Sequence, residues 1–307
     1  MNLIHIGLPK TGTTTLQNAV FPRQTRFSYI GKINNRYSPE LRDLVTRISF
    51  QDSLEYDPSV VEALAERQRD HSKPSLISDE IFSVEGRADR RLVAERLHHL
   101  FAPAKVLIVL RAQPSMLQSM YLNHVRGSDE RVGSFSSWLD KNYGSIRFAD
   151  LYRIGLNYEP LVRTYEEVFG TDNVVVLPFE LLRDPDSLFA ATIADLVGMA
   201  PEDVKASLAR NVDNQRMSRR HLRALYLQAL LPKGTNLALA GRRLLPDPVY
   251  AGIRNFVTAG RRMQSPDLPE GWLARIAKQC APGNAAIEAR RRIPLKALGY
   301  PAELRAE

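Results

Sequence analysis

The sequence predicts an α/β fold, in which a parallel sheet carries helices on both faces and a helical C-terminal extension follows. Two observations predict it. Short apolar runs rich in β-branched residues, as in strands buried on both faces, alternate with stretches whose apolar residues recur at helical spacing. The 307 residues can also bury a sizeable core, and the hydrophobic and charged contents of 44% and 25% are typical of a globular protein.

The first predicted strand, residues 3–6, leads into the loop Gly7-Leu8-Pro9-Lys10-Thr11-Gly12 and a helix over residues 14–20. Glycines permit the backbone turns at which N–H groups converge on an anion, and the helix dipole adds favourable potential there. We expect the threonines at positions 13–15 to cap the helix. The segment predicts a phosphate-binding loop, with a simple glycine turn as the alternative.

This loop departs from the phosphate-loop pattern G-x-x-x-x-G-K-[ST]. Gly7 and Gly12 fit the pattern, but Thr13 stands at the lysine position and Lys10 lies inside the loop. An ordinary ATP or GTP site is therefore not expected.

The remaining elements follow in order. Further strands are predicted over residues 27–30, 74–78, 104–110 and 173–177, where apolar runs are bounded by Gly, Pro or charged residues. Helical spacing predicts helices between them and after the last strand, over most of 39–70 and over 88–100, 135–143, 157–169, 188–197, 201–208, 220–231 and 250–263, with another helix starting at Pro114.

Candidate catalytic and binding residues follow two of the predicted strands. Asp79 and Glu80 follow the strand over 74–78, and ligands gather at the carboxyl ends of strands in α/β sheets, so this pair is a candidate general base. A helix cap is the alternative. Arg111 follows the strand over 104–110, and Ser119 lies eight residues on. A guanidinium and a hydroxyl suit a phosphate group.

Lys10-Thr11-Gly12-Thr13-Thr14 resembles the 5′-phosphosulfate loop of sulfotransferases, the enzymes that use 3′-phosphoadenosine 5′-phosphosulfate (PAPS). The resemblance covers residues 1–185 and implies a P-loop-type sheet. It assigns the phosphosulfate to residues 10–15, including Thr15, and the 3′-phosphate to Arg111 and Ser119.

The same resemblance assigns further roles. It favours Glu80 over Asp79 as the base, by similarity to glycan sulfotransferases, and it implies that Arg216 and Arg219 lie in a basic loop over the 3′-phosphate. The segment from Pro178 to Pro185 resembles Y-E-D-L-x-x-D-P, but Phe179 and Leu181 replace the tyrosine and the aspartate. We therefore expect a strand-to-helix hinge there, without chemistry.

The function implied is in-line sulfuryl transfer from PAPS, a co-substrate, to a hydroxyl on a carbohydrate or glycolipid, with no metal. Glu80 or Asp79 would take the proton, and Lys10 would neutralise charge on the leaving oxygen. A divergent phosphate-loop nucleotide kinase is the second hypothesis. A non-enzymatic basic protein that binds nucleic acid is the third, since the net charge is +8 and Lys and Arg are in excess over residues 211–307.

Composition sets the remaining expectations. One cysteine, Cys280, excludes an internal disulfide, and no apolar run is long enough to span a bilayer, so we expect a cytoplasmic protein. We expect a main domain over residues 1–231 and a helical extension over 232–307 that packs on it. A peripheral membrane contact is compatible with a lipid-linked acceptor. The sequence does not indicate an oligomeric state.

Overall fold

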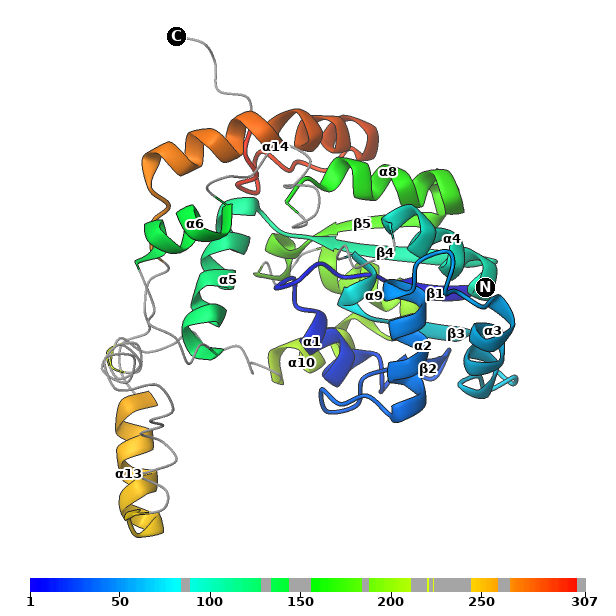
Figure 1. The fold of residues 1–307 in the computed structure, drawn as a ribbon, viewed down its shortest axis with the longest axis horizontal. Helices are drawn as coiled ribbons and strands as arrows, with labels where there is room; N and C mark the ends of the chain where they lie inside the picture. The colour runs from blue at the N-terminus through cyan, green and yellow to red at the C-terminus, as the bar shows by residue number, and fades with distance from the viewer. Residues whose placement is uncertain are drawn as a thin grey trace. The chain divides into compact units, whose positions relative to one another are not determined.

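The sheet has five parallel strands in the order β2-β3-β1-β4-β5 (Figure 1). The strands are β1 Asn2–His5, β2 Ser28–Gly31, β3 Ser75–Ser78, β4 Ala104–Leu110 and β5 Val174–Pro178. The computed structural model describes residues 1–83, 89–127, 134–143, 156–183, 188–210, 220, 223, 244–258 and 266–302. Each strand lies within one residue of its predicted bounds, so the predicted α/β class is confirmed.

Helices connect the strands and follow them. They are α1 Thr13–Thr15, η1 Leu16–Val20, α2 Pro39–Phe50, α3 Pro58–Arg67, η2 Glu80–Ser83, α4 Arg90–Phe101, α5 Gln113–Gly127, α6 Phe135–Tyr143, α8 Tyr158–Phe169, η3 Thr171–Asn173, η4 Phe179–Arg183, α9 Leu188–Val197, α10 Pro201–Arg210, α13 Asp247–Thr258 and α14 Glu270–Arg291. Only positions 220 and 223 of the helix predicted over 220–231 are among the described residues. No described helix is long and apolar enough to cross a membrane.

Alternate residues of the strands point to opposite faces of the sheet. On one face, Leu3, Leu76 and Leu107 join a core cluster with apolar residues of η1, α9 and α10. On the other face, α8 packs against β4 and β5 and also against α4. Both faces are therefore covered by helices, which explains why the strands read as continuous apolar runs.

Side-chain caps fix the start of several helices. The Ser38 hydroxyl accepts from the Leu41 amide at 3.2 Å before α2, and Asp89 accepts from the Arg91 amide at 2.6 Å before α4. Asp57 caps α3 in the same way. The region predicted as mostly helical over 39–70 is thus two helices, because Asp57 and Pro58 start a second one.

The described chain divides into two compact units. The first contains residues 1–116, 146–213 and 274–307, and the second contains residues 117–145 and 214–273. The sheet and the strand ends belong to the first unit. In the second unit, Trp138 packs beside Tyr121 and Phe135, and the Trp272 indole donates to Asp140 at 3.1 Å.

The C-terminal region is helical, as predicted, and residues 274–302 belong to the first unit. Cys280 and Ile287 of α14 are buried, as are Leu295 and Tyr300 after it. The side chains of Asn284 and Gln113 bond to each other, and the Asn284 amide also donates to the carbonyl of Pro301 at 3.0 Å. The described residues of α14 and of the segment after it thus contribute to the core. The predicted boundary near residue 231 lies outside the described residues.

Candidate functional site

The carboxyl ends of all five strands lie at one edge of the sheet, because every strand pair is parallel. A loop or a side chain follows each strand at that edge. These are the loop over residues 6–12 after β1, Lys32 after β2, Asp79 and Glu80 after β3, Arg111 after β4, and Phe179 and Glu180 after β5. The strand order places the loop in the middle, with the β3 end on one side of it and the β4 end on the other.

The loop has an unusual backbone. Lys10 and Gly12 adopt left-handed conformations, with φ of 66° and 81°. The Thr15 and Leu16 amides donate to the Gly12 carbonyl at 2.9 and 3.1 Å, so the helix begins directly after the loop. The first amides of a helix, here those of Thr13 and Thr14, have no carbonyl partner within it. They are therefore suited to an anion.

The predicted threonine cap is wrong. Gly12 is the N-cap residue of α1, and no side chain caps this helix. The Thr11 and Thr13 hydroxyls donate instead to the Leu8 carbonyl, at 2.5 and 3.5 Å, because the turn brings that carbonyl close to them. Beyond Thr15 the helix continues as the π-helix η1, in which the Phe21 amide donates to Leu16 at 2.8 Å.

Neither glycine of the loop has room for a side chain. A Cβ on Gly7 would collide with the Thr13 hydroxyl and lie 2.7 Å from His5 Nε2. A Cβ on Gly12 would lie 2.9 Å from the Phe179 ring, and its positive φ disfavours any side chain. The loop is thus held closely between the strand below it and the residue that follows β5.

Arg111 connects the loop to β4. Its Nη1 donates to the Lys10 carbonyl at 2.6 Å, and its Nε donates to the Ser115 hydroxyl at 3.0 Å. The guanidinium also lies over the Phe179 ring, 4.9 Å from its centre. Ser119 belongs to the second unit, so its role beside Arg111 stays a prediction.

A hydrogen-bonded brace supports Arg111, and no sequence pattern indicated it. Glu180 accepts from the Ala112 amide and from the Tyr300 hydroxyl, both at 3.0 Å, and the Tyr158 hydroxyl donates to the Arg111 carbonyl. The pKa values of Tyr158 and Tyr300 are raised well above that of an ordinary tyrosine, mainly because both are buried. Both hydroxyls therefore keep their protons and act as donors. Phe179 and Glu180 thus support the site, although we predicted only a hinge there.

Asp79 is fully buried and its carboxylate is engaged. It accepts from the Tyr37 hydroxyl at 2.6 Å and from the Ile81 amide at 3.0 Å, and it lies 3.5 Å from the Lys32 ammonium. The bond to Ile81 is the helix-capping role that the sequence left open. Lys32 and Tyr37 are distant in sequence from Asp79, so no sequence pattern indicated this cluster.

Glu80 has different surroundings. It begins η2 and is partly exposed at the same edge as the loop. Burial, the largest cause, raises the pKa of the Glu80 carboxyl, and the negative charge of Asp79 raises it further. The positive charges of Lys32 and Lys10 partly offset this rise. Lys10 is therefore close enough to Glu80 to act on its charge. This arrangement allows a carboxylate to serve as a base beside the anion loop.

Other predicted features lie elsewhere. Arg216 and Arg219 lie outside the described residues. Within the described ranges, no group of three His, Cys, Asp or Glu could hold a metal ion.

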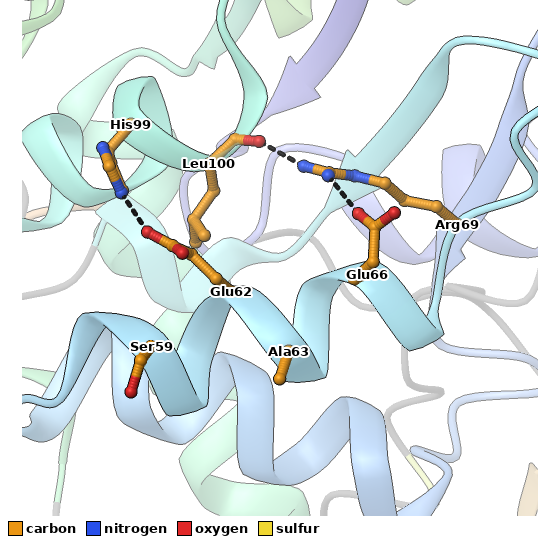
Figure 2. Close-up of a pocket in the computed structure, with 7 residues that line it drawn as sticks. All are labelled: Ser59, Glu62, Ala63, Glu66, Arg69, His99 and Leu100. Atoms are coloured by element: carbon orange, nitrogen blue, oxygen red, sulfur yellow. Dashed lines mark hydrogen bonds and ion pairs between the residues drawn. The ribbon is translucent and has the colours of Figure 1, made fainter.

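Two cavities lie away from the candidate site. The larger, of about 530 Å³, lies between α3 and the end of α4, where Glu62 contacts His99 and Arg69 contacts Glu66 and the Leu100 carbonyl (Figure 2). A second one, of about 150 Å³, is lined by Asn2 and Lys105 among others. Both cavities are lined by residues that come just before a strand or at its start: Arg69 and Leu100 in the larger one, Asn2 and Lys105 in the smaller one. Both cavities therefore lie toward the amino ends of the strands.

Comparison with known proteins supports the fold. No protein-family model matches the sequence, and no curated protein matches it significantly. The structure is similar to the crystal structure of a sulfotransferase from Alicyclobacillus acidocaldarius, with a TM-score of 0.54 and 18% sequence identity. The similarity covers 97% of this chain and 98% of that one. The chain therefore has the fold of a sulfotransferase, a P-loop-type parallel sheet with helices on both faces.

Proposed function

We propose that the chain is a PAPS-dependent sulfotransferase, which moves a sulfuryl group to a hydroxyl of a carbohydrate or glycolipid. One observation carries the proposal: the anion loop lies between a strand end with Glu80 and one with Arg111, which donates to the loop backbone. We assign one anionic group of the ligand to the loop and a second to the Arg111 guanidinium beside it. PAPS has a 5′-phosphosulfate and a 3′-phosphate.

The residues of the loop suit the phosphosulfate. The amides at the start of α1 have no partner within the helix, and the missing side chains of Gly7 and Gly12 let the loop pack closely against His5 and Phe179. We assign the phosphosulfate to the amides and hydroxyls of residues 11–15 and to the Lys10 ammonium. We assign the 3′-phosphate to Arg111 and, from the sequence alone, to Ser119, Arg216 and Arg219.

In the proposed reaction the acceptor oxygen bonds to sulfur as its proton passes to Glu80. The bond from sulfur to the bridging oxygen breaks, and the electron pair stays on that oxygen. Lys10 neutralises the growing charge, so 3′,5′-adenosine diphosphate leaves more easily. Positioning and electrostatics thus provide the catalysis, as in phosphoryl transfer. We expect turnover without Mg²⁺, because Lys10 and Arg111 supply the positive charge.

Two alternatives make different predictions. A divergent nucleotide kinase would bind ATP with Mg²⁺, but Thr13 stands where the phosphate-loop lysine would be. A nucleic-acid-binding protein would bind DNA or RNA with an affinity that falls steeply with salt.

Calorimetry with three ligands tests the proposal. We expect 3′,5′-adenosine diphosphate to bind more tightly than adenosine 5′-monophosphate, which lacks the 3′-phosphate, and more tightly than ATP with Mg²⁺. Arg111→Ala should remove the preference for the 3′-phosphate. Tighter binding of ATP with Mg²⁺ would favour the kinase, and an equal affinity of wild type for the two adenosine ligands would refute the 3′-phosphate site.

The acceptor and the setting of the reaction are part of the proposal. Labelled PAPS offered to pools of glycans, glycolipids and small alcohols identifies the acceptor by transfer of label. We propose a cytoplasmic enzyme with no nucleic-acid partner, which contacts a membrane surface peripherally if its acceptor is lipid-linked. Transfer to none of the pools would count against a hydroxyl acceptor of these classes.

A further inference from the structure

A buried polar cluster lies beneath the anion loop. His5 is the last residue of β1, Ser78 is the last residue of β3, and Gln17 lies in η1. Their exposed fractions are 0%, 1% and 2%. Polar side chains this deeply buried are costly unless they are hydrogen-bonded, so the bonds of the cluster define what it can do.

The hydrogen bonds of the cluster favour one tautomer of the His5 ring. Gln17 Nε2 donates to both the carbonyl and the hydroxyl oxygen of Ser78, each at 3.1 Å. The Ser78 hydroxyl lies 2.8 Å from His5 Nδ1. Among the described residues, Nδ1 is the acceptor available for the proton of the Ser78 hydroxyl. We assign Nδ1 as the acceptor of the Ser78 proton, which puts the proton of the neutral ring on Nε2. Burial lowers the pKa of His5 to about 3, so the ring stays neutral.

The Nε2–H group points toward the loop. Among the described residues, buried Nε2 has no hydrogen-bond partner. A Cβ on Gly7 would meet both this nitrogen and the Thr13 hydroxyl, so the two groups lie close to the same point beside Gly7. The edge-on contact of the Phe21 ring, with 5.2 Å between ring centres, helps to hold the imidazole in this orientation.

The Thr13 hydroxyl is the natural acceptor for this proton. Thr13 stands where an ordinary phosphate loop has its lysine. Among the described residues its hydroxyl has two long contacts, 3.5 Å to the Leu8 carbonyl and 3.5 Å to the Thr11 hydroxyl, so it can turn at little cost. A hydroxyl that accepts one hydrogen bond directs its own proton elsewhere, and the open side of the loop is where the anion would lie.

We propose that His5 is a positioning residue of the donor site: its Nε2–H donates to Thr13 Oγ1 when an anion is bound, which directs the Thr13 proton to that anion. Ser78 and Gln17 hold the ring in the required tautomer. The inference rests on the proposed function, because the anion is taken to be the phosphosulfate of PAPS. The buried donor is then satisfied only in the occupied loop, which makes His5 important for affinity rather than for folding.

Calorimetry on two variants tests this role. His5→Phe keeps a ring of similar shape but removes the donor, and we expect roughly ten-fold weaker binding of 3′,5′-adenosine diphosphate. His5→Gln places an amide N–H near the Nε2 position and should restore most of the affinity. His99→Phe, at an exposed histidine on α4, is the control and should bind like wild type. Equal affinities of His5→Phe and wild type would overturn the proposal.

Nuclear magnetic resonance of the wild-type protein gives a second test that needs no variant. The ring nitrogens of His5 should report the Nε2–H tautomer between pH 5 and 8. Addition of 3′,5′-adenosine diphosphate should shift the Nε2 proton downfield. A proton on Nδ1, or an unchanged signal while calorimetry shows binding, would refute the role of His5 alone. Absence of binding to wild type would refute the proposed function itself.

Discussion

Lys10 occupies a backbone conformation that few residues other than glycine adopt. The left-handed φ costs about 1 kcal/mol or more, and the hydrogen bond from Arg111 to the Lys10 carbonyl holds it. The side chain therefore leaves the loop in a fixed direction, near enough to Glu80 for the two charges to interact. In the proposed reaction, Lys10 takes the role that a lysine at position 13 would have in an ordinary phosphate loop.

We expect Lys10→Ala to reduce turnover on the order of 100-fold to 1000-fold, because it removes the cation that neutralises the leaving oxygen. The melting temperature should stay close to that of wild type, since the bond from Arg111 goes to the backbone. Lys73→Ala, at an exposed lysine before β3, is the matched control. Steady-state kinetics with PAPS measure the effect, and wild-type turnover in Lys10→Ala would contradict the assignment.

Glu80 and Asp79 have different surroundings, so we expect different effects when each is changed. Glu80→Gln should lower turnover on the order of 100-fold or more, with a smaller change in donor affinity, because it removes the base. Asp79→Asn should mainly lower stability, because it weakens a buried cluster with Tyr37 and Lys32. The opposite pattern would make Asp79 the base.

The pH dependence follows from the same cluster. A base works only when it has lost its proton, and the pKa of Glu80 is raised, so activity should fall on the acid side at a higher pH than for an ordinary carboxyl. Lys32→Met removes a charge that lowers this pKa and should move the acid limb to still higher pH. Profiles of kcat/KM measure it, and a shift to lower pH would contradict the assignment.

At the scale of elements, the strand ends were predictable and their supports were not. Five apolar runs predicted the strands, and parallel pairing follows from their alternation with helices, so Lys10, Glu80 and Arg111 could be expected at one edge. The brace of Glu180 and Tyr300 joins residues 120 positions apart. Such a contact depends on how α14 and the chain after it pack, and no local periodicity records that.

The brace can be tested by removing one hydroxyl. Tyr300→Phe leaves an oxygen of the half-buried Glu180 without its donor, and we expect a loss of about 1–3 kcal/mol in the free energy of unfolding, since hydrogen bonds to charged groups contribute this much. Tyr56→Phe is the control, since the buried Tyr56 hydroxyl has no hydrogen-bond partner among the described residues. Urea denaturation compares the two, and equal stability of both variants would show that the brace contributes nothing.

At the scale of the whole molecule, the end of the chain completes the first unit. Residues 274–302 bury Ile287, Leu295 and Tyr300 in the unit that carries the sheet. The sequence predicted helices here and packing on the main domain. It could not show which part of 232–307 packs there, because amphipathic spacing indicates that a helix has an apolar face and not what covers it.

A shortened chain tests this dependence. We expect residues 1–231 alone to lack a cooperative thermal transition, because the α8 face and the Gln113 amide would lose their partners in 274–302. A chain ending at residue 302 should melt like the full chain. Calorimetric scans compare them, and a sharp transition in the 1–231 chain would show that the first unit does not need its C-terminal part.

The single cysteine of the chain lies inside this unit and gives the protein a built-in reporter. Burial raises the pKa of the Cys280 thiol to about 12, so the folded protein presents no thiolate to an alkylating reagent. Labelling of the native protein then requires local opening around α14, and its rate measures how often that opening occurs. A ligand that binds the folded state should slow the labelling, so one mass measurement over time reads out ligand binding without a tag, a dye or knowledge of the acceptor.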